Sequence, residues 1–332
     1  MPKFLVIQTA FTGDVVLATA LIEQLQQFHP QSDIDFLLRK GNEGLLEGHP
    51  FIKKLWVWDK QKNKTQNLLK LAFEIRKAHY THVINVHRFA TSGLITFLSG
   101  AKSKAGFDKN PFSFCYTKKV RHIISEPYSA NFVHETERNQ MLIADITTKE
   151  AAFPKLYPQA KDYEKVKHLK NKLYVCISPA SVWFTKQFPM EKWVSLIDMI
   201  PAAYNIYLLG GPSDSELARE IKNKSSHAGL SDLCGQLSYM QSVAMIQDAA
   251  MNYTNDSAPL HFASAIDAPV TAVFCSTVPA FGFGPVRNNG KVVEIKERLY
   301  CRPCGLHGKK ACPEGHFRCA MDITNDELLW WI

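Results

Sequence analysis

Short apolar runs alternate with helical patterns along the chain, and this alternation occurs twice. Apolar runs of this kind indicate buried strands. The runs in the first half cover residues 4–7, 33–38, 52–58 and 82–87, with predicted helices from residue 15 and over 65–79. Those in the second half cover 173–179, 205–211, 251–256 and 269–274, with predicted helices over 190–200, 214–222, 239–249 and 259–266. Strands that alternate with helices form parallel sheets covered on both faces, so the sequence predicts an α/β chain.

The pattern is interrupted between its two halves. A predicted helix over 134–145 is followed by the irregular segment TTKEAAFPKLYPQAKDYEKV, which places a domain boundary near residue 160. A length of 332 residues suits two domains. Because crossovers between parallel strands are right-handed, the sequence predicts two Rossmann-like domains, residues 1–160 and 161–322.

The composition is that of a soluble globular protein, with 46% hydrophobic and 21% charged residues. No apolar run approaches the length of a membrane span and no signal-peptide pattern is present, so a cytoplasmic location is expected. The formal net charge of +8 indicates an anionic partner, although lysine clusters around 53–64 and 102–121 are also explained as a solvated surface. Nucleic acid is not the expected partner, because no basic and aromatic motif accompanies the charge.

The loop after the first predicted strand, QTAFTGD, carries a single glycine, Gly13, followed by Asp14. Ligands of open α/β sheets bind at the carboxyl ends of the strands, so this loop is a candidate site. A dinucleotide-binding loop would carry several glycines there, which disfavours a Rossmann dehydrogenase. A carboxylate at this position is suited to accepting a proton.

Three loops of the second half carry groups that suit a nucleotide and its phosphates. Ser181 and Lys186 can donate hydrogen bonds to a phosphate, and Asp214 can accept them from a ribose. Asp256 and Ser257 begin a predicted helix whose N-terminus would favour an anion, and His261 lies in its first turn. A surface lysine and ordinary helix capping by Asp214, Asp256 or Ser257 are the structural alternatives.

The combination of these loops indicates transfer of a group from a diphosphate. The second domain would hold the leaving phosphate, and Asp14 would take a proton from the attacking hydroxyl.

Several motifs, in this order along nearly the whole chain, resemble glycosyltransferase family 9, the ADP-heptose:lipopolysaccharide heptosyltransferases. They are Gly13-Asp14, S-x-x-x-x-K-x-F-P at 181–189, G-G-P at 210–212 and N-D-S-x-x-x-H at 255–261. The resemblance implies a GT-B fold, in which two Rossmann-like domains face each other across a cleft. It also implies an inverting transfer of heptose from ADP-heptose to the inner core of lipopolysaccharide, with no cofactor required for catalysis.

The resemblance also implies residue roles. Asp14 would be the general base, and the donor-binding residues would be Gly13, Ser181, Lys186, Asp214, Asp256, Ser257 and His261. The acceptor would be a lipid-anchored acidic saccharide, reached from a peripheral position at the inner membrane, and Arg88 is expected to contact it. The sequence departs from the family at Ala258, where a glycine is usual and a positive φ would be costly for alanine, and at Phe188, where tryptophan is usual.

Two other functions stay open at this point. One is a family 9 transferase that uses another nucleotide sugar for a different surface polysaccharide, and the other is a nucleotide-binding module without turnover. The final residues, 323–332, are expected to form a helix that packs back on the first domain, with membrane contact by their two tryptophans as the alternative.

Four cysteines lie close together in the segment 301–319. Cys301, Cys304, Cys312 and Cys319 have the spacing C-x2-C-x7-C-x6-C. The first pair matches a zinc knuckle and the later gaps match no standard spacing. A structural zinc ion is one interpretation, and reduced or disulfide-paired cysteines that shape a loop are the other.

Overall fold

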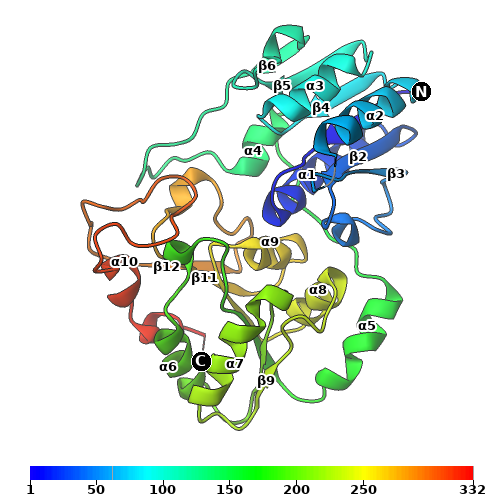
Figure 1. Cartoon of the computed structure of the whole chain (residues 1–332). Helices are drawn as coiled ribbons and strands as arrows, with labels where there is room; N and C mark the ends of the chain where they lie inside the picture. Colours follow the sequence, from blue (N-terminus) through cyan, green and yellow to red (C-terminus); the bar gives the residue numbers. More distant parts are fainter. Residues whose placement is uncertain (62, 332) are drawn as a thin grey trace. The chain divides into compact units, whose positions relative to one another are not determined.

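A computed structural model describes residues 1–61 and 63–331, which form two compact units (Figure 1). The first unit comprises Met1–Ile124 and Glu135–Tyr157, and the second comprises Ser125–His134 and the chain from Pro158 onward. The chain therefore crosses between the units close to the expected boundary at residue 160. The short segment Ser125–His134 is an excursion of the first half into the second unit, which the sequence analysis did not anticipate.

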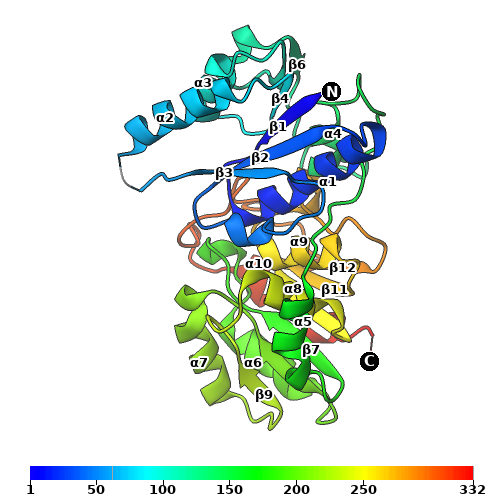
Figure 2. The ribbon, with the colours of Figure 1, turned by 90° about the vertical axis from the view of Figure 1, so that its right-hand side faces the viewer.

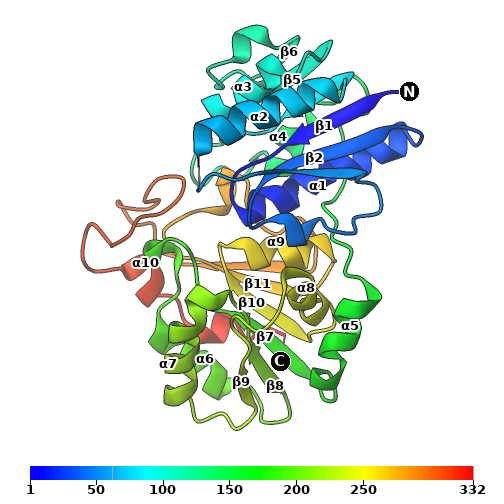
Figure 3. The same ribbon diagram turned by 45° about the vertical axis from the view of Figure 1, so that its right-hand side comes forward.

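The first unit is built on a parallel six-stranded sheet with the order β3-β2-β1-β4-β5-β6. The strands are β1 (Lys3–Ile7), β2 (Asp33–Arg39), β3 (Lys54–Trp58), β4 (His82–Asn85), β5 (Ser103–Phe107) and β6 (Lys118–Val120). The helices are α1 (Thr12–Phe28), α2 (Lys64–Lys77), α3 (Ala90–Leu98) and α4 (Glu135–Gln140). Helices α2 and α3 pack together, and α1 packs with α4 on the opposite face of the sheet (Figures 2 and 3). This is the doubly wound arrangement that the alternating sequence predicts.

The second unit repeats the same strand order, with the sheet β12-β11-β10-β7-β8-β9, again all parallel. Its strands are β7 (Tyr174–Ser178), β8 (Asn205–Leu208), β9 (Leu230–Asp232), β10 (Met251–Asn255), β11 (Val270–Phe274) and β12 (Gly290–Glu294). Its helices are α5 (Ala160–Val166), α6 (Met190–Met199), α7 (Ser215–Lys224), α8 (Tyr239–Gln247), α9 (Ala258–Ala265) and α10 (Arg318–Met321). In both sheets the strand order reverses beside the first strand, which is where open α/β sheets bind ligands.

Most of the predicted elements are present. The sequence analysis missed helices α3 and α5 and strands β5 and β12, as well as the three-residue strands β6 and β9. Helix α4 ends at Gln140, so the helix predicted over 134–145 is shorter than expected. Helix α1 begins at Thr12, which places Gly13 and Asp14 inside its first turn and not in a loop before it. Strand β6 was missed because its sequence, Lys-Lys-Val, is polar and short, as edge strands commonly are.

The expectation for the C-terminal residues was wrong. In place of a helix packed on the first domain, the segment forms a single 3₁₀ turn, η7 (Asn325–Glu327), within the second unit. Leu328 is fully buried in the core of that unit, and its carbonyl accepts a hydrogen bond of 3.1 Å from the Tyr253 hydroxyl of β10. Trp331 donates to the same hydroxyl (2.6 Å), which gives a buried phenol both of its partners.

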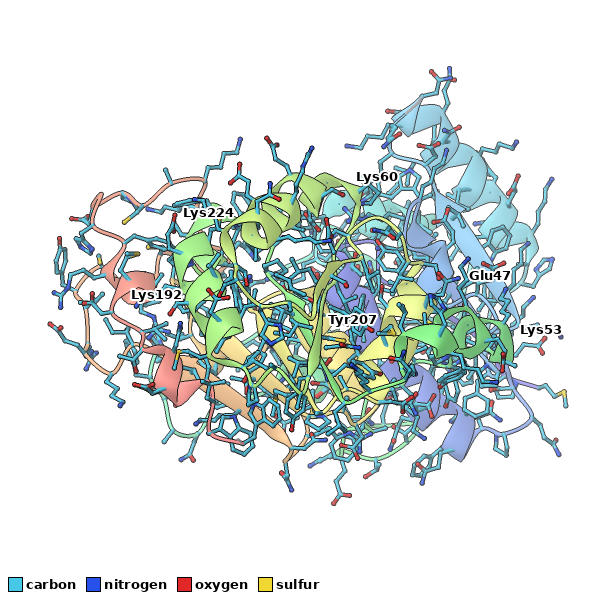
Figure 4. The ribbon with its side chains drawn as sticks, turned by 90° about the horizontal axis from the view of Figure 1, so that it is seen from below. Glu47, Lys53, Lys60, Lys192, Tyr207 and Lys224 are labelled. Carbon is cyan, nitrogen blue, oxygen red and sulfur yellow. The ribbon has the colours of Figure 1, made fainter. Side chains whose placement is uncertain are left out.

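A second contact holds this segment on α6. Lys192, labelled in Figure 4, donates through Nζ to the carbonyl of Ile323 at 2.9 Å, and its own carbonyl accepts from Asn325 Nδ2 at 3.0 Å. Local periodicity suggested a helix, but long-range partners for these polar groups decide the conformation.

Candidate active site

The loops that follow β7 and β10 are joined by one buried amide, the side chain of Asn255. Its Nδ2 donates to the carbonyl of Pro179 at 2.8 Å, and its Oδ1 accepts from the backbone N–H of Phe188 at 2.8 Å. Asn255 is the last residue of β10, and β10 pairs directly with β7. The amide therefore fixes the loop over 179–189 at the point where the strand order reverses. Phe188 is buried beneath this loop, in edge contact with Trp193.

Lys186 and Asp256, predicted to contact one donor, form an ion pair with each other. Lys186 Nζ lies 2.7 Å from Asp256 Oδ2, and the two side chains are 15% and 7% exposed. The Thr277 hydroxyl donates to the same carboxylate oxygen at 2.6 Å. An ammonium has three donors, so this pair leaves Lys186 with capacity to bind an anion beside it. The carboxylate fixes the position of the lysine at the carboxyl edge of the second sheet.

Ser257 and Ala258 form the start of α9. Ser257 is the N-cap residue, but its hydroxyl does not cap the helix and lies 3.4 Å from the carbonyl of Asn255. Ala258 is helical, so the position where the family has glycine carries no left-handed strain in this chain. Pro259 has no N–H, and the Leu260 N–H donates to the Ser257 carbonyl at 3.2 Å, so the Ala258 N–H is the donor that the first turn of α9 offers to an anion.

Two other predicted donor residues are used differently. Asp214 accepts from the backbone N–H of Gly211 at 2.8 Å and so caps the turn after β8, which is the structural alternative for this residue. A Cβ on Gly210 would lie 2.9 Å from Asp214 Oδ2, so the turn requires glycine there. Ser181 is half-buried in the loop after β7, and its backbone N–H donates to Gln187 Oε1 at 3.2 Å.

His261 lies in α9 and is 4% exposed. Burial lowers the pKa of its imidazole to about 3, although the Asp256 carboxylate acts in the opposite direction. Its Nδ1 has no hydrogen-bond partner among the described residues, and its ring contacts Phe283. His261 is therefore neutral at pH 7 and contributes no positive charge to a phosphate site.

The free energy of unfolding is expected to fall as the pH drops from about 6.5 toward 4. Burial lowers the pKa of His49 to about 4 and those of His122 and His261 to about 3, from an ordinary value of 6.5. The unfolded chain takes up protons on these imidazoles below pH 6.5 while the folded chain does not, so each contributes a slope of about 1.4 kcal/mol per pH unit. Urea unfolding at pH 7, 6 and 5 measures the slope. The variant His261→Gln should lower the slope by about 1.4 kcal/mol per pH unit, the contribution of one imidazole. An unchanged slope in that variant would contradict this assignment.

In the first unit, Asp14 is half-buried in the first turn of α1, directly after β1. Residues that follow the neighbouring strands gather at the same sheet edge. Thr9 Oγ1, after β1, lies 3.0 Å from His87 Nδ1, after β4. Lys60, after β3, donates to the Thr9 carbonyl at 2.8 Å. Arg88 follows His87 and is half-buried, so the predicted acceptor residue lies at the carboxyl edge of the sheet that carries Asp14.

This edge of the first sheet is positively charged. Burial and the neighbouring cations Arg39 and Lys64 lower the pKa of Lys60 to about 8. Burial, Lys60 and Arg88 likewise lower the pKa of His87 to about 4. The sequence analysis placed Lys60 in a surface lysine cluster, although its position two residues after a strand was a signal that it lies at the ligand-binding edge.

Arg302 supports the second-unit site and was not predicted. Its guanidinium is 5% exposed and donates to the carbonyls of Phe274, Cys275 and Thr277 at 3.1, 2.7 and 2.6 Å. It also pairs with Glu294 at 2.6 Å. Arg302 thus holds the loop after β11 in the conformation that presents Thr277 to Asp256.

The cysteine-bearing segment packs directly behind Lys186. The Thr185 hydroxyl accepts from the Ser276 hydroxyl at 2.9 Å and from the Lys309 backbone N–H at 2.7 Å. Gly308 has φ +78°, and a Cβ there would lie 2.9 Å from Lys186 Cγ. Both the left-handed conformation and the close approach to Lys186 therefore require glycine at 308.

The four predicted metal ligands line one pocket. Cys301, Cys304, Cys312 and Cys319 line an open pocket of about 480 Å³ together with His316, and all four are free thiols. Cys301 Sγ lies 3.9 Å from His316 Nε2, and burial raises the pKa of Cys319 to about 12. Within residues 1–61 and 63–331, no group of three or more His, Cys, Asp or Glu side chains is arranged to hold a metal ion. A structural zinc ion, which would require these side chains to move closer together, stays a prediction.

If the cysteines hold a structural zinc ion, protein purified without chelators should contain about one equivalent of zinc by elemental analysis and should lose thermal stability in EDTA. Less than about 0.1 equivalent of zinc, with a thermal unfolding temperature that EDTA leaves unchanged, would contradict the prediction.

Comparison with known proteins identifies the family. The profile of glycosyltransferase family 9 (heptosyltransferase) matches residues 68–314. Lipopolysaccharide heptosyltransferase 3 of Escherichia coli is 25% identical over 291 residues, which cover 84% of this chain and 85% of that protein. The solved structure of E. coli ADP-heptose lps heptosyltransferase II has a TM-score of 0.81 at 20% identity, over 99% of this chain and 97% of that chain. The structure of E. coli heptosyltransferase WaaC with ADP-2-deoxy-2-fluoro heptose has a TM-score of 0.69 at 18% identity, over 98% and 97%.

The family profile covers well over half of the chain, and it spans the loops that carry Lys186, Asp256 and Arg302. The two solved structures share the fold, which is GT-B, with two Rossmann-like α/β domains. No helix within the described residues is long and apolar enough to span a bilayer. The chain belongs to glycosyltransferase family 9, the heptosyltransferase family, and is a glycosyltransferase.

Proposed function

We propose that this chain transfers a heptose from ADP-heptose to the inner core of lipopolysaccharide, with inversion at the anomeric carbon. The observation that carries the proposal is the Lys186–Asp256 ion pair, because it fixes an ammonium beside the N-terminus of α9. Both features bind anions, and a diphosphate is the leaving group of a nucleotide-sugar donor. The relatives named above act on lipopolysaccharide, and one solved relative holds an ADP-heptose analogue.

The proposed reaction is a single displacement. The acceptor hydroxyl oxygen forms a bond to the anomeric carbon while the bond from that carbon to the diphosphate oxygen breaks, and ADP leaves. The hydroxyl proton passes to the Asp14 carboxylate. Lys186 and the Ala258 N–H at the start of α9 stabilise the negative charge that develops on the leaving diphosphate. Attack from the side opposite the leaving group accounts for inversion.

The acceptor in this proposal is a lipid-anchored acidic saccharide. The charge at the carboxyl edge of the first sheet supports it, because Arg39, Lys60 and Arg88 lie on the same edge as Asp14. Cations of this kind attract the carboxylates and phosphates of an acidic sugar acceptor. An enzyme with such an acceptor would work in the cytoplasm at the inner membrane.

Release of ADP that depends on the acceptor tests the proposal. Purified protein is incubated with ADP-heptose and a lipopolysaccharide core acceptor, and ADP is measured with and without the acceptor. Rapid release of ADP is expected only when both substrates are present. UDP- and GDP-sugars should release UDP and GDP much more slowly. Faster turnover with another nucleotide sugar would favour a different polysaccharide, and ADP binding without turnover would favour a regulatory module. Either result would overturn the proposal.

A further inference from the structure

Three phenylalanine rings form an exposed cluster on the first unit. Phe97 lies near the end of α3, and Phe112 and Phe114 lie in the segment that follows β5. The ring centroids are 5.9–6.1 Å apart in all three pairs. Phe97 is 45% exposed and Phe114 is 67% exposed. We call these three residues the phenylalanine cluster.

The fold holds this cluster in place. Asn110 donates through Nδ2 to the carbonyls of His87 and Phe89 at 3.1 and 3.0 Å, and its Oδ1 accepts from the Phe112 backbone N–H at 2.9 Å. A Cβ on Gly93 of α3 would lie 2.1 Å from Asn110 Oδ1 and 2.9 Å from Phe112 Cβ. Glycine at 93 therefore allows the segment to lie directly against α3. The rings are presented by a packed loop with satisfied hydrogen bonds, which makes their exposure a built feature of the fold.

The sequence around the cluster is strongly basic. Residues 86–125 contain one acidic residue, Asp108, and seven basic ones. The basic residues are Arg88, Lys102, Lys104, Lys109, Lys118, Lys119 and Arg121. This segment has a formal charge of +6 (seven positive minus one negative), out of +8 for the whole chain.

The positive charges lie close to the rings. Burial raises the pKa of the Cys115 thiol, and the nearby charges of Lys104 and Lys119 lower it. Cys115 directly follows Phe114 in the 3₁₀ turn η2 (Ser113–Cys115). Lys118 is paired with Asp145, whereas Lys119 is exposed. This surface of the first unit therefore combines an apolar centre with exposed positive charge.

We infer that the phenylalanine cluster and the lysines beside it bind the surface of an anionic phospholipid bilayer. Phenylalanine rings of this kind enter the boundary between headgroups and acyl chains, and lysines are attracted to anionic headgroups. Attachment through this surface is peripheral, since no described helix could span the bilayer. The inference deepens the proposed function, because an enzyme whose acceptor is lipid-anchored has to work beside that membrane.

The test is sedimentation of the full chain with vesicles, without donor or acceptor. One set contains phosphatidylglycerol and phosphatidylethanolamine, and the other contains phosphatidylcholine alone. Wild type should bind the anionic vesicles, more weakly at high salt, and bind phosphatidylcholine at least about tenfold more weakly. The double variant Phe97→Ser/Phe114→Ser should bind anionic vesicles more weakly by a factor of roughly ten or more, because it lacks the two rings that would transfer from water into the bilayer interface. Lys104→Gln/Lys119→Gln should reduce binding and its salt dependence.

Phe28→Ser is the matched control. Phe28 is 44% exposed and ends α1, which lies on the opposite face of the sheet from α3, so its replacement should change binding less than twofold. Phe114→Ser alone, at the most exposed ring, provides a milder variant if the double variant unfolds on circular dichroism. Turnover on a soluble core oligosaccharide should be unchanged in all of these variants, which separates this inference from the proposed function.

Several outcomes would overturn the inference. They are no binding of wild type to anionic vesicles, equal binding to both vesicle sets, and full binding by the folded phenylalanine variants. If wild type binds anionic vesicles but shows no turnover on the soluble acceptor, that result would contradict the proposed function and not this inference. If wild type does not bind vesicles but binds a purified acidic protein through the phenylalanine cluster, the surface binds a protein partner and the bilayer assignment is wrong.

Discussion

Asparagine in place of Asp14 is expected to lower kcat for acceptor-dependent ADP release by about 100-fold or more, with little change in the KM for the donor. The substitution keeps the size of the side chain in the first turn of α1 but removes its ability to accept a proton. The attacking hydroxyl would then lose its proton to water, which raises the barrier of the chemical step. Steady-state kinetics with both substrates measure the effect.

Two further measurements make this result specific to proton transfer. The acidic limb of the kcat/KM profile should disappear in Asp14→Asn, because that limb reports protonation of the base. Glu47→Gln removes the same charge from an exposed residue of the first unit, labelled in Figure 4, and should leave kcat within about twofold of wild type. Near wild-type kcat in Asp14→Asn would eliminate Asp14 as the general base.

Alanine in place of Lys186 is expected to lower kcat/KM for the donor by about 100-fold and to destabilise the fold. The kinetic loss follows from removing a charge-assisted hydrogen bond to the leaving diphosphate. The loss of stability follows from Asp256, whose side chain is 7% exposed and would keep a buried charge with Thr277 as its remaining polar partner. Removing one partner of a buried pair costs about 3 kcal/mol or more. Urea unfolding and donor titration measure the two effects separately.

A double variant distinguishes the structural role of Lys186 from its role in catalysis. Lys186→Ala/Asp256→Asn should recover part of the lost stability, because no unpaired carboxylate stays buried, while kcat/KM stays low. Lys224→Ala, at the exposed end of α7, is the matched control and should leave both quantities near wild type. If activity returned together with stability, Lys186 would only hold Asp256, and the phosphate-binding role would be wrong.

The fold was predictable to a large extent because its signals are local. Strand β7 and helix α6 differ from their predicted bounds by two residues or fewer, and the strand-helix alternation anticipated both sheets. The edge strands β6 and β9 have three residues each and lack an apolar run, so no periodicity marks them. The C-terminal segment was misassigned because its conformation depends on Tyr253 and Lys192, which are distant in the sequence.

The sequence predicted where most of the candidate site residues lie in the fold, but it did not predict which of them contact each other. Asp14, Ser181 and Asp256 follow the carboxyl ends of β1, β7 and β10, since that placement follows from the order of strand and loop. The sequence offered capping by Asp214 only as an alternative, and it could not show that His261 is buried and neutral. It also gave no indication that Lys186 and Asp256 pair with each other.

By itself, the sequence determined two α/β halves and the segments after strands that carry Asp14, Lys186 and Asp256, because hydrophobic periodicity and turn residues act over neighbouring positions. Only the tertiary structure decided which side chains meet. The pairing of β7 with β10 brings Asn255 to the loop that carries Lys186, and Arg302 reaches the carbonyls at the end of β11 from the cysteine-bearing segment. Such contacts join residues many positions apart, and they form only once the order of strands in the sheet has been set.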